Sequence, residues 1–454
     1  MILINKYKNI VVIGGNAAGP AAAAKAKRVS PESEVILLEA GEFISTGTCE
    51  LPYLLENTIN DYRSIIFFDE KTFFEEKKVL VKNFSIVKSI NRKQKQLFVY
   101  DNKKNENYIL NYDKLVLATG SYIPNIPEII ESPFNFSKFK TINDFFKISD
   151  FIKDKGKNKI LILGAGFTGL ELSDALTNIG KSVVLFDKRK VFYENSDESY
   201  EYIKKIIQNK GIELLDQQEK IEFIYKNNNI THYKLNGRVF EVDYVVQCTG
   251  VRPNNYLGES SALVLGSYGG LKVDSKLKTS DSNIFAAGDN IEVQEFVTGK
   301  YIYMPIATLA RKFGHIAGEN AAGGNNFIHP VIKNITFKFG KNTFAFIGLS
   351  LNAIKQHNYR FMKVYAASNS LVHVMPNSEK VYGILYVDAN SNLILGAEFW
   401  GNNIAASYAD IISIYIKNRI KANNLEDEMF NYSPPVSPMI NLLNILGQKL
   451  KKER

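Results

Sequence analysis

The chain has 454 residues, and its 45% hydrophobic and 23% charged residues are typical of a globular protein. Its net charge is +9, but no long basic block favours nucleic acid as a partner. No apolar run reaches the roughly 18 residues of a membrane-spanning helix, and the N-terminus has no signal-peptide pattern, so we expect a cytoplasmic protein without membrane partners. Cys49 and Cys248 form no metal-ligand spacing and no disulfide framework, so we expect no metal site and a reducing compartment.

The first strong pattern is an apolar strand from residue 9, a glycine-rich turn, an alanine-rich helix and a second strand over residues 34–39. Glycines let the backbone approach a pyrophosphate, and the helix N-terminus offers free N–H groups to it. An acid at the tip of the second strand can bind ribose hydroxyls. Asn16 replaces the middle glycine of the GxGxxG motif. The candidate residues for this first dinucleotide are Gly14, Gly15, Asn16, Ala18, Gly19 and Glu39.

A complete GxGxxG motif follows at residues 164–169, between a strand and a helix, and Asp187 ends the next strand. Two such units in one chain predict two bound dinucleotides. Asp187 favours NADH, while Lys188 and Arg189 could hold a 2′-phosphate, which leaves NADPH open. The candidate residues of this second site are Gly164, Gly166, Phe167, Thr168, Gly169, Glu171 and Asp187.

Two further strands, over residues 112–120 and 282–289, each end in a turn of small residues. Both resemble the flavin-binding strands of the pyridine nucleotide-disulfide oxidoreductases, and the resemblance covers essentially the whole chain. It implies that Asp289 bonds the ribityl chain of the flavin. The other cofactor residues that the resemblance assigns are Ala118, Thr119, Gly120, Gly250 and Ala307.

The family resemblance also implies an architecture. We expect an α/β fold with two Rossmann-like dinucleotide-binding domains, for FAD and for NADH or NADPH, and a C-terminal α+β dimerisation domain. The FAD-binding domain would be discontinuous, comprising residues 1–126 and 250–327. Residues 127–249 would bind NAD(P)H, and residues 328–454 would form the dimerisation domain.

The cysteine count selects a branch of this family. Only Cys49 lies in the active region, and its loop resembles that of the single-cysteine coenzyme A-disulfide reductases and their NADH oxidase and persulfide reductase relatives. We expect the start of the helix at Leu51 to lower the pKa of the Cys49 thiol, because a thiolate is the form that attacks a disulfide. Glu50 replaces the usual small residue; its charge would repel a thiolate but also suits a helix N-terminus, so the sequence leaves its net effect open. We expect Cys248, at the end of an apolar strand, to lie in the core.

Coenzyme A needs basic groups for its phosphates. Lys25 and Arg28 lie three residues apart, on one face of the first helix, and Lys77 is a further candidate. In the coenzyme A-disulfide reductases this helix face and two polar residues flanking the cysteine hold coenzyme A, and Ser45 and Thr48 occupy the flanking positions here.

Other positions bear on the choice of acceptor. Ala17 stands where the peroxidase relatives carry a histidine, which disfavours peroxide reduction. Tyr432 resembles the family tyrosine that reaches the cysteine of the partner subunit and could donate a proton to a leaving thiolate. A second family tyrosine, just before a proline, is missing here, where the sequence reads Val374-Met375-Pro376. Its loss disfavours efficient turnover of coenzyme A disulfide and is equally compatible with a persulfide, a polysulfide or another low-molecular-weight disulfide as substrate.

The sequence therefore predicts a homodimeric flavoenzyme that takes hydride from NAD(P)H near Glu171. FAD would pass two electrons to Cys49, which would reduce a low-molecular-weight disulfide or persulfide, with coenzyme A disulfide first among them. Two alternatives remain open. One is an NADH oxidase in which Cys49 cycles through a sulfenic acid and oxygen is the acceptor. The other is a flavin redox sensor or electron-transfer protein with a protein acceptor.

Overall fold

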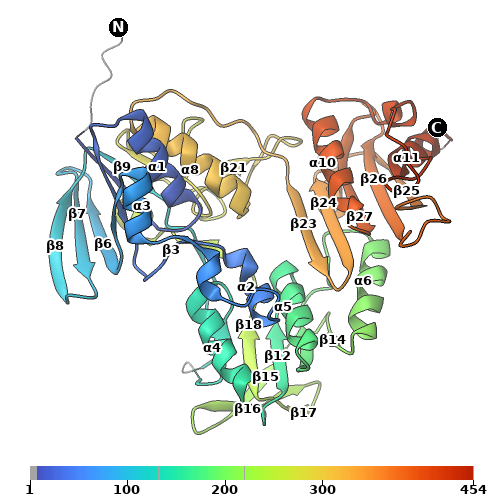
Figure 1. Cartoon of the computed structure of the whole chain (residues 1–454), viewed down its shortest axis with the longest axis horizontal. Helices are drawn as coiled ribbons and strands as arrows, with labels where there is room; N and C mark the ends of the chain where they lie inside the picture. The colour runs from blue at the N-terminus through green and yellow to red at the C-terminus, as the bar shows by residue number, and fades with distance from the viewer. Residues whose placement is uncertain (1–7, 131–132, 155, 219, 453–454) are drawn as a thin grey trace.

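The computed structural model describes residues 8–130, 133–154, 156–218 and 220–452. Figure 1 shows three lobes, of which one is blue and yellow, one green, and one orange to red. Each lobe is built on its own five-stranded β-sheet. The lobe that combines blue and yellow elements is formed by two segments far apart in the sequence.

The sheet of the first lobe is parallel and has the order β20-β9-β1-β2-β5, where β1 is Asn9–Ile13, β2 Glu34–Leu38, β5 Leu80–Lys82, β9 Lys114–Leu117 and β20 Ile284–Ala286. Its central strands are continuous apolar runs buried on both faces, as parallel strands usually are. Helices α1 (Ala18–Val29) and α8 (Ala307–Ala321) pack so closely that a Cβ atom on Gly318 would lie only 2.0 Å from the Ala22 carbonyl oxygen. Glycine, which has no Cβ atom, permits this contact. Helix α3 (Glu70–Lys77) packs against β5 and α1.

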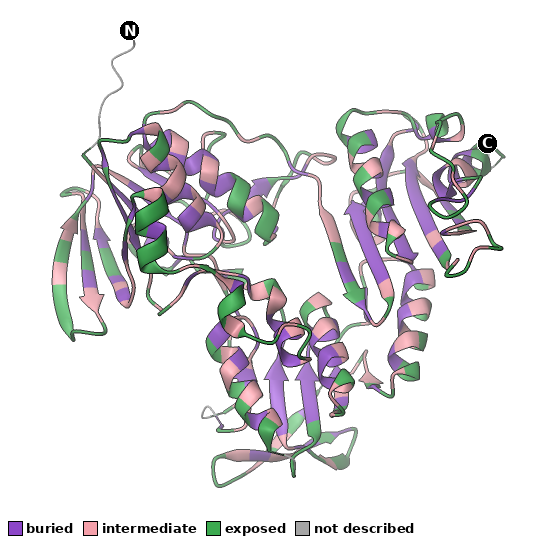
Figure 2. Ribbon diagram, in the orientation of Figure 1, coloured by how far each residue is buried: buried purple, intermediate pink, exposed green. Residues whose placement is uncertain are grey.

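The sheet of the second lobe is also parallel, with the order β11-β18-β12-β13-β14. Figure 2 shows its central strands in purple, which marks buried residues. The strands are β11 (Phe136–Lys138), β12 (Lys159–Leu163), β13 (Ser182–Phe186), β14 (Glu213–Leu215) and β18 (Tyr244–Gln247), and the helices are α4 (Ile142–Lys153), α5 (Phe167–Asn178) and α6 (Asp197–Asn209).

The third lobe has an antiparallel sheet of order β23-β24-β27-β26-β25, comprising Asn334–Phe339, Asn342–Gly348, Ile394–Gly401, Lys380–Asp388 and Phe361–Asn369 in that order. One face packs against α10 (Ile404–Lys417) and α11 (Leu442–Lys452). The other face packs against the second lobe through an aromatic cluster, in which the Phe337 ring lies 5.0 Å from that of Phe167 and 5.8 Å from that of Phe192. The second and third lobes therefore share a hydrophobic core.

Smaller elements complete the lobes. The strands are β3 (Ile44–Thr46), β4 (Ile66–Phe68), β6 (Ser85–Asn91), β7 (Gln96–Asp101), β8 (Glu106–Asn111), β10 (Ser121–Tyr122), β15 (Glu222–Lys226), β16 (Asn229–Leu235), β17 (Arg238–Glu241), β19 (Arg252–Pro253), β21 (Val293–Gln294) and β22 (Tyr301–Ile302). The short helices are α2 (Leu51–Leu55), α7 (Tyr256–Ser260) and α9 (Leu351–Gln356), and the 3₁₀ turns are η1 (Thr48–Glu50), η2 (Tyr62–Ile65) and η3 (Ala422–Glu426).

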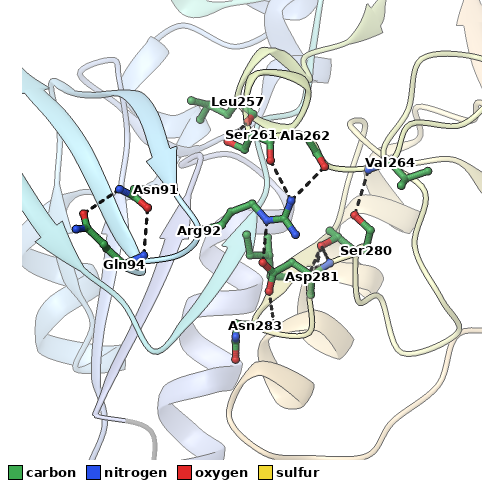
Figure 3. A network of polar contacts seen from close by, with 12 residues as sticks. Asn91, Arg92, Gln94, Leu257, Ser261, Ala262, Val264, Ser280, Asp281 and Asn283 are labelled. Carbon is green, nitrogen blue, oxygen red and sulfur yellow. Dashed lines mark hydrogen bonds and ion pairs between the residues drawn. The ribbon is translucent and has the colours of Figure 1, made fainter.

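Arg92 joins the two segments of the first lobe (Figure 3). It follows β6, and its Nε donates to Asp281 Oδ2 at 2.8 Å while its Nη1 donates to the carbonyl oxygens of Ser261 and Ala262 at 3.1 Å. A guanidinium group satisfies several acceptors in one plane, so a single side chain fixes the later segment against the earlier one.

The predicted α/β fold with two Rossmann-like parallel sheets is confirmed, together with an α+β third lobe. The strands of the first parallel sheet lie at residues 9–117 and 284–286, and those of the second lie at residues 136–247. We keep the domain limits at residues 126, 250 and 328 as a proposal. None of the helices within the described ranges is long and apolar enough to cross a membrane.

Candidate functional site

The two nucleotide loops have the same geometry. Gly14 and Gly164 have φ values of +109° and +107°, which L side chains rarely adopt. A Cβ atom on Gly14 would lie 2.1 Å from the carbonyl oxygen of Ala118, and one on Gly164 would lie 2.4 Å from that of Cys248. In both lobes the turn therefore passes directly over the end of the neighbouring strand. Gly19 and Gly169 permit the next close approach, because their Cβ atoms would lie 1.7 and 1.9 Å from the carbonyl oxygens of Gly14 and Gly164.

The helices that follow these loops keep their first N–H groups free of side-chain caps. Helices α3, α4 and α6 are capped by the side chains of Asp69, Thr141 and Ser196. In contrast, the N-cap residues of α1 and α5 are Ala17 and Gly166, which provide no side-chain cap, and neither helix has an acidic residue in its first turn. Free N–H groups and the positive end of the helix dipole suit the pyrophosphate of a dinucleotide.

The acidic residue after each second strand is placed beside its loop. Glu39 Oε2 accepts a hydrogen bond from the Gly15 N–H at 2.6 Å, and Oε1 accepts one from Gly41 at 2.7 Å. Asp187 Oδ2 accepts from the Ala165 N–H at 2.8 Å. Each carboxylate is therefore held beside its loop, where an acid accepts hydrogen bonds from the ribose hydroxyls of a dinucleotide.

A cavity of about 660 Å³ opens beside the first loop and reaches the start of α5 at Thr168 and Glu171, whereas the predicted residues Gly164, Gly166, Gly169 and Asp187 do not line it. It brings together residues that are far apart in the chain, including the start of α1, the cysteine loop, the start of α5 and the start of α8. The predicted site residues that line it are Gly14, Gly15, Asn16, Ala18, Glu39, Thr48, Cys49, Ala118, Thr119, Gly120, Thr168, Glu171, Gly250, Asp289 and Ala307. Glycines, free helix N–H groups and a ribose acceptor meet here, so these residues fit a flavin dinucleotide.

The predicted residues differ in how they contribute to this site. Asp289 lies in the cavity wall, where its carboxylate accepts a hydrogen bond from the Ser121 hydroxyl at 2.8 Å. Ser45 does not line the cavity; its N–H donates to the Gly15 carbonyl oxygen at 2.8 Å and so holds the cysteine loop against the first glycine loop. The Phe167 side chain packs into the aromatic cluster of the third lobe, so it is its backbone N–H that remains available to a dinucleotide.

Cys49 is exposed to this cavity, whereas Cys248 is buried in the core as expected. Burial strongly raises the pKa of the Cys248 thiol, so that sulfur stays protonated. Within the part of the chain that the structure describes, no group of His, Cys, Asp or Glu residues could hold a metal ion.

The expectation of a lowered pKa for the Cys49 thiol is wrong for this structure. Burial and the charges of Glu50, Glu171 and Asp289 raise its pKa and outweigh Lys140, which lowers it. Cys49 lies in the 3₁₀ turn η1, and the following α2 has five residues, so the helix contributes too short a dipole to outweigh three carboxylates. The effect of Glu50, which the sequence left unsigned, is to disfavour the thiolate.

Glu171 is the strongly perturbed acid of the cavity. Burial and the neighbouring charge of Asp174 raise the pKa of its carboxyl group to about 7. Asp174 is itself held by the Lys210 ammonium group at 2.6 Å and by the N–H of Gly340 in the third lobe at 2.7 Å. Burial and Glu171 also raise the pKa of the Tyr53 hydroxyl, on α2. A carboxyl group with a pKa of about 7 can gain or lose a proton near neutral pH.

The predicted substrate residues are not all free. The Lys25 ammonium group pairs with Glu319 at 3.0 Å, while Arg28 is exposed. Lys77 pairs with Glu76 at 3.0 Å, lies over the Phe68 ring and does not line the cavity. The facing helix α8 contributes Arg311 and His315, two residues that the sequence did not single out. Burial and the charges of Arg311, Arg28 and Lys25 lower the pKa of His315. The α1–α8 face thus carries an excess of positive charge.

Tyr432 is 48% exposed and does not line the cavity of its own chain. It lies in a segment with several exposed apolar side chains, among them Met429 at 95% and Met439 at 73% exposure. An apolar segment of this kind is typical of a surface that another chain covers.

The comparisons with known proteins agree with this geometry. The family model described as pyridine nucleotide-disulphide oxidoreductase matches residues 8–308. An NADH oxidase of Methanocaldococcus jannaschii is 27% identical over 448 residues, covering 98% of each chain. A coenzyme A disulfide reductase of Staphylococcus aureus is 28% identical over 457 residues, covering 97% of this chain and 99% of the relative. The solved structure of an NAD-dependent persulfide reductase from A. fulgidus superposes with a TM-score of 0.93 at 29% identity, over 98% of this chain and 83% of that one.

Proposed function

The chain belongs to the pyridine nucleotide-disulphide oxidoreductases, which are flavoproteins that use FAD and NAD(P)H, and we propose that it reduces a low-molecular-weight disulfide or persulfide through Cys49. The observation that carries this proposal is the cavity beside the first nucleotide loop and the start of α5, to which Cys49 is exposed, whereas Cys248, also in its wall, is buried. A single accessible sulfur excludes an intramolecular dithiol cycle within this chain, so the second sulfur has to come from the substrate.

The reaction balances with one cysteine. The Cys49 thiolate attacks a substrate disulfide R–S–S–R, which forms the mixed disulfide Cys49–S–S–R and releases one thiolate. FAD, when bound, carries two electrons from the nicotinamide to this mixed disulfide. Reduction of the S–S bond releases the second thiolate and regenerates the Cys49 thiolate. Hydride from NADH supplies one proton equivalent and solvent the other, so that NADH, H⁺ and RSSR become NAD⁺ and two RSH.

Coenzyme A disulfide is the substrate that we propose first. Its phosphates are anionic, and the charges of Lys25, Arg28 and Arg311, which meet around His315 on the α1–α8 face, exceed the single negative charge that Glu319 supplies there. Thr48 lines the cavity next to Cys49. Lys77, whose ammonium group is paired, gives this reading less support than Arg28. The persulfide reductase among the structural relatives makes a persulfide the second substrate to test.

We also propose that the enzyme is a homodimer in which Tyr432 reaches the Cys49 site of the other subunit. The exposed apolar segment around Tyr432 supplies the surface, and a phenol beside the sulfur could protonate a leaving thiolate. The two free cysteines fit a reducing, cytoplasmic compartment, in which we place the protein.

The test follows NADH and NADPH oxidation by the purified flavin-loaded enzyme with coenzyme A disulfide, a polysulfide, peroxide and oxygen as separate acceptors. We expect the highest kcat/KM with coenzyme A disulfide and loss of that activity in Cys49→Ser. Cys248→Ser is the matched control and should keep it, since that thiol is buried and protonated. Full activity of Cys49→Ser with every sulfur acceptor would refute the proposal.

One other function has a specific observation in its favour. An NADH oxidase relative matches nearly the whole chain, and the exposed Cys49 thiol could cycle through a sulfenic acid with oxygen as the acceptor. Rapid NADH oxidation with oxygen alone, together with slow turnover of coenzyme A disulfide, would select this function instead.

A further inference from the structure

The charges that line the cavity are strongly unbalanced. Among the described residues of its wall, the only side chain with a positive charge is that of Lys140. The acidic side chains of the same wall are Glu39, Glu42, Glu171 and Asp289. Any anion that forms in this cavity therefore has one cationic side chain to stabilise it.

Lys140 is held on a rigid backbone at the entrance to α4. Its N–H donates to Asp144 Oδ2 at 3.0 Å, and the Thr141 N–H donates to the same atom at 2.9 Å. Thr141 and Asp144 also form a reciprocal capping box, so the carboxylate of Asp144 is engaged by the backbone. The Lys140 side chain is half-buried and makes no ion pair with another residue of the described ranges, which leaves its charge for the cavity.

The acidic groups near the Cys49 sulfur disfavour its ionisation. Glu50 belongs to the same 3₁₀ turn, while Glu171 on α5 and Asp289 in the turn after β20 line the same cavity as Cys49, and the charges of all three raise the pKa of its thiol. Burial and Glu171 also raise the pKa of the Tyr53 hydroxyl on α2. Lys140, on the wall of the same cavity, acts in the opposite direction and lowers the pKa of Cys49.

We propose that Lys140 is the positioning cation of the sulfur site, whose ammonium group stabilises the Cys49 thiolate in place of a helix dipole. This inference rests on the proposed function, since it concerns the thiolate that attacks the substrate disulfide. Lys140 transfers no proton in this role. Its ammonium group acts on the thiolate through its charge, against the carboxylates of Glu50, Glu171 and Asp289.

The experiment measures the rate at which iodoacetamide alkylates Cys49 as a function of pH, in the flavin-loaded enzyme, with mass spectrometry to locate the modification. The buried Cys248 gives no background. In Lys140→Met we expect the pH midpoint of alkylation to rise by about one unit or more, because an opposite charge near a thiolate has been removed. Lys140→Arg should restore the midpoint, and Glu50→Gln should lower it.

Lys147→Met is the matched control, because it removes the same charge from an exposed position of α4 outside the cavity wall. The flavin absorbance spectrum shows for each variant that the site has folded. An unchanged midpoint in both Lys140→Met and Lys140→Gln, with flavin bound, would overturn the inference. Failure of the proposed function has a different signature, namely sulfur-reductase activity that survives Cys49→Ser.

Discussion

The Asp187 carboxylate accepts a hydrogen bond from the Ala165 N–H at 2.8 Å, across the turn of the second nucleotide loop. Its other oxygen accepts from the Arg189 N–H at 2.8 Å. The two cations that follow Asp187 are engaged elsewhere, since Lys188 pairs with Glu128 at 2.8 Å and the Arg189 guanidinium group lies over the Tyr193 ring at 4.1 Å. The Asp187 carboxylate is therefore held at the loop, while the two cations that could bind a 2′-phosphate have other partners.

This arrangement predicts a preference for NADH over NADPH. Asp187→Ala removes the acceptor for the ribose hydroxyls and the repulsion of a 2′-phosphate. We expect the ratio of kcat/KM for NADH to that for NADPH to fall by at least about tenfold, which corresponds to about 1.4 kcal/mol. Asp150→Ala, which removes an exposed acid of α4, is the control. An unchanged ratio in Asp187→Ala would show that Asp187 does not read the ribose.

The sequence predicts those parts of the site that depend on local backbone geometry. Gly14 and Gly164 had to be glycines because of their positive φ and their contact with the neighbouring strand, so the motif alone located both loops. The contribution of Lys140 could not be predicted in this way. Its role depends on which groups three separate segments bring to one cavity, and no spacing along the chain encodes that.

The packing of the second lobe against the third could not be predicted from the sequence either. Phe167 lies within the glycine motif and was assigned to the cofactor, yet its ring packs against Phe337 and Phe346 of the third lobe. The pKa of Cys49 was predicted in the wrong direction for a related reason. The sequence showed the helix that follows Cys49, but the carboxylate of Glu171 comes from another lobe and contributes only in the folded chain.

Glu171 predicts the pH dependence of turnover. Its pKa of about 7 means that the carboxyl group is protonated below neutral pH and ionised above it. We expect an inflection near pH 7 in kcat that Glu171→Gln abolishes. Asp174→Asn should move the inflection toward lower pH, because removal of a neighbouring negative charge favours ionisation of Glu171. An inflection that is the same in Glu171→Gln would assign it to another group.

Arg92 predicts how stability changes in acid. Burial acts to raise the pKa of Asp281, but the hydrogen bonds from Arg92 and from the Asn283 N–H outweigh it and lower that pKa (Figure 3). Because the folded-state pKa lies below the value of about 3.9 in the unfolded chain, the stabilisation is present above that pH and is lost as the pH falls further. Arg92→Met should lower the free energy of unfolding by about 1 to 2 kcal/mol at pH 7 and should weaken its dependence on acid.

The matched control for this prediction is Arg63→Met. Arg63 also pairs with an aspartate, Asp61, at 3.1 Å, but both side chains are exposed and belong to one turn. An exposed pair of this kind contributes little to stability. Equal destabilisation by the two variants, measured by urea unfolding, would mean that Arg92 does not join the two segments of the first lobe.

Glu398 predicts that the second and third lobes unfold together. This carboxylate is 2% exposed and accepts hydrogen bonds from the N–H and the hydroxyl of Ser196, both at 2.9 Å, and from the Tyr386 hydroxyl at 2.5 Å. Glu398→Ala leaves these donors buried without an acceptor, so we expect a loss of about 2 to 4 kcal/mol in unfolding free energy. Glu34→Ala, at an exposed strand end, should leave it unchanged. A stability loss confined to the third lobe, seen by hydrogen exchange, would contradict this coupling.

Tyr432 predicts that two subunits complete each active site. Tyr432→Phe keeps the ring but removes the proton donor, and we expect turnover with coenzyme A disulfide to fall by about a hundredfold. When Cys49→Ser and Tyr432→Phe subunits are co-expressed with different tags, the purified heterodimer contains one site with both Cys49 and Tyr432. That heterodimer should recover about half of the wild-type activity, since one of its two sites is intact. If Tyr432 acted on the cysteine of its own chain, the same heterodimer would be no more active than the Tyr432→Phe enzyme, because no subunit would then carry both groups.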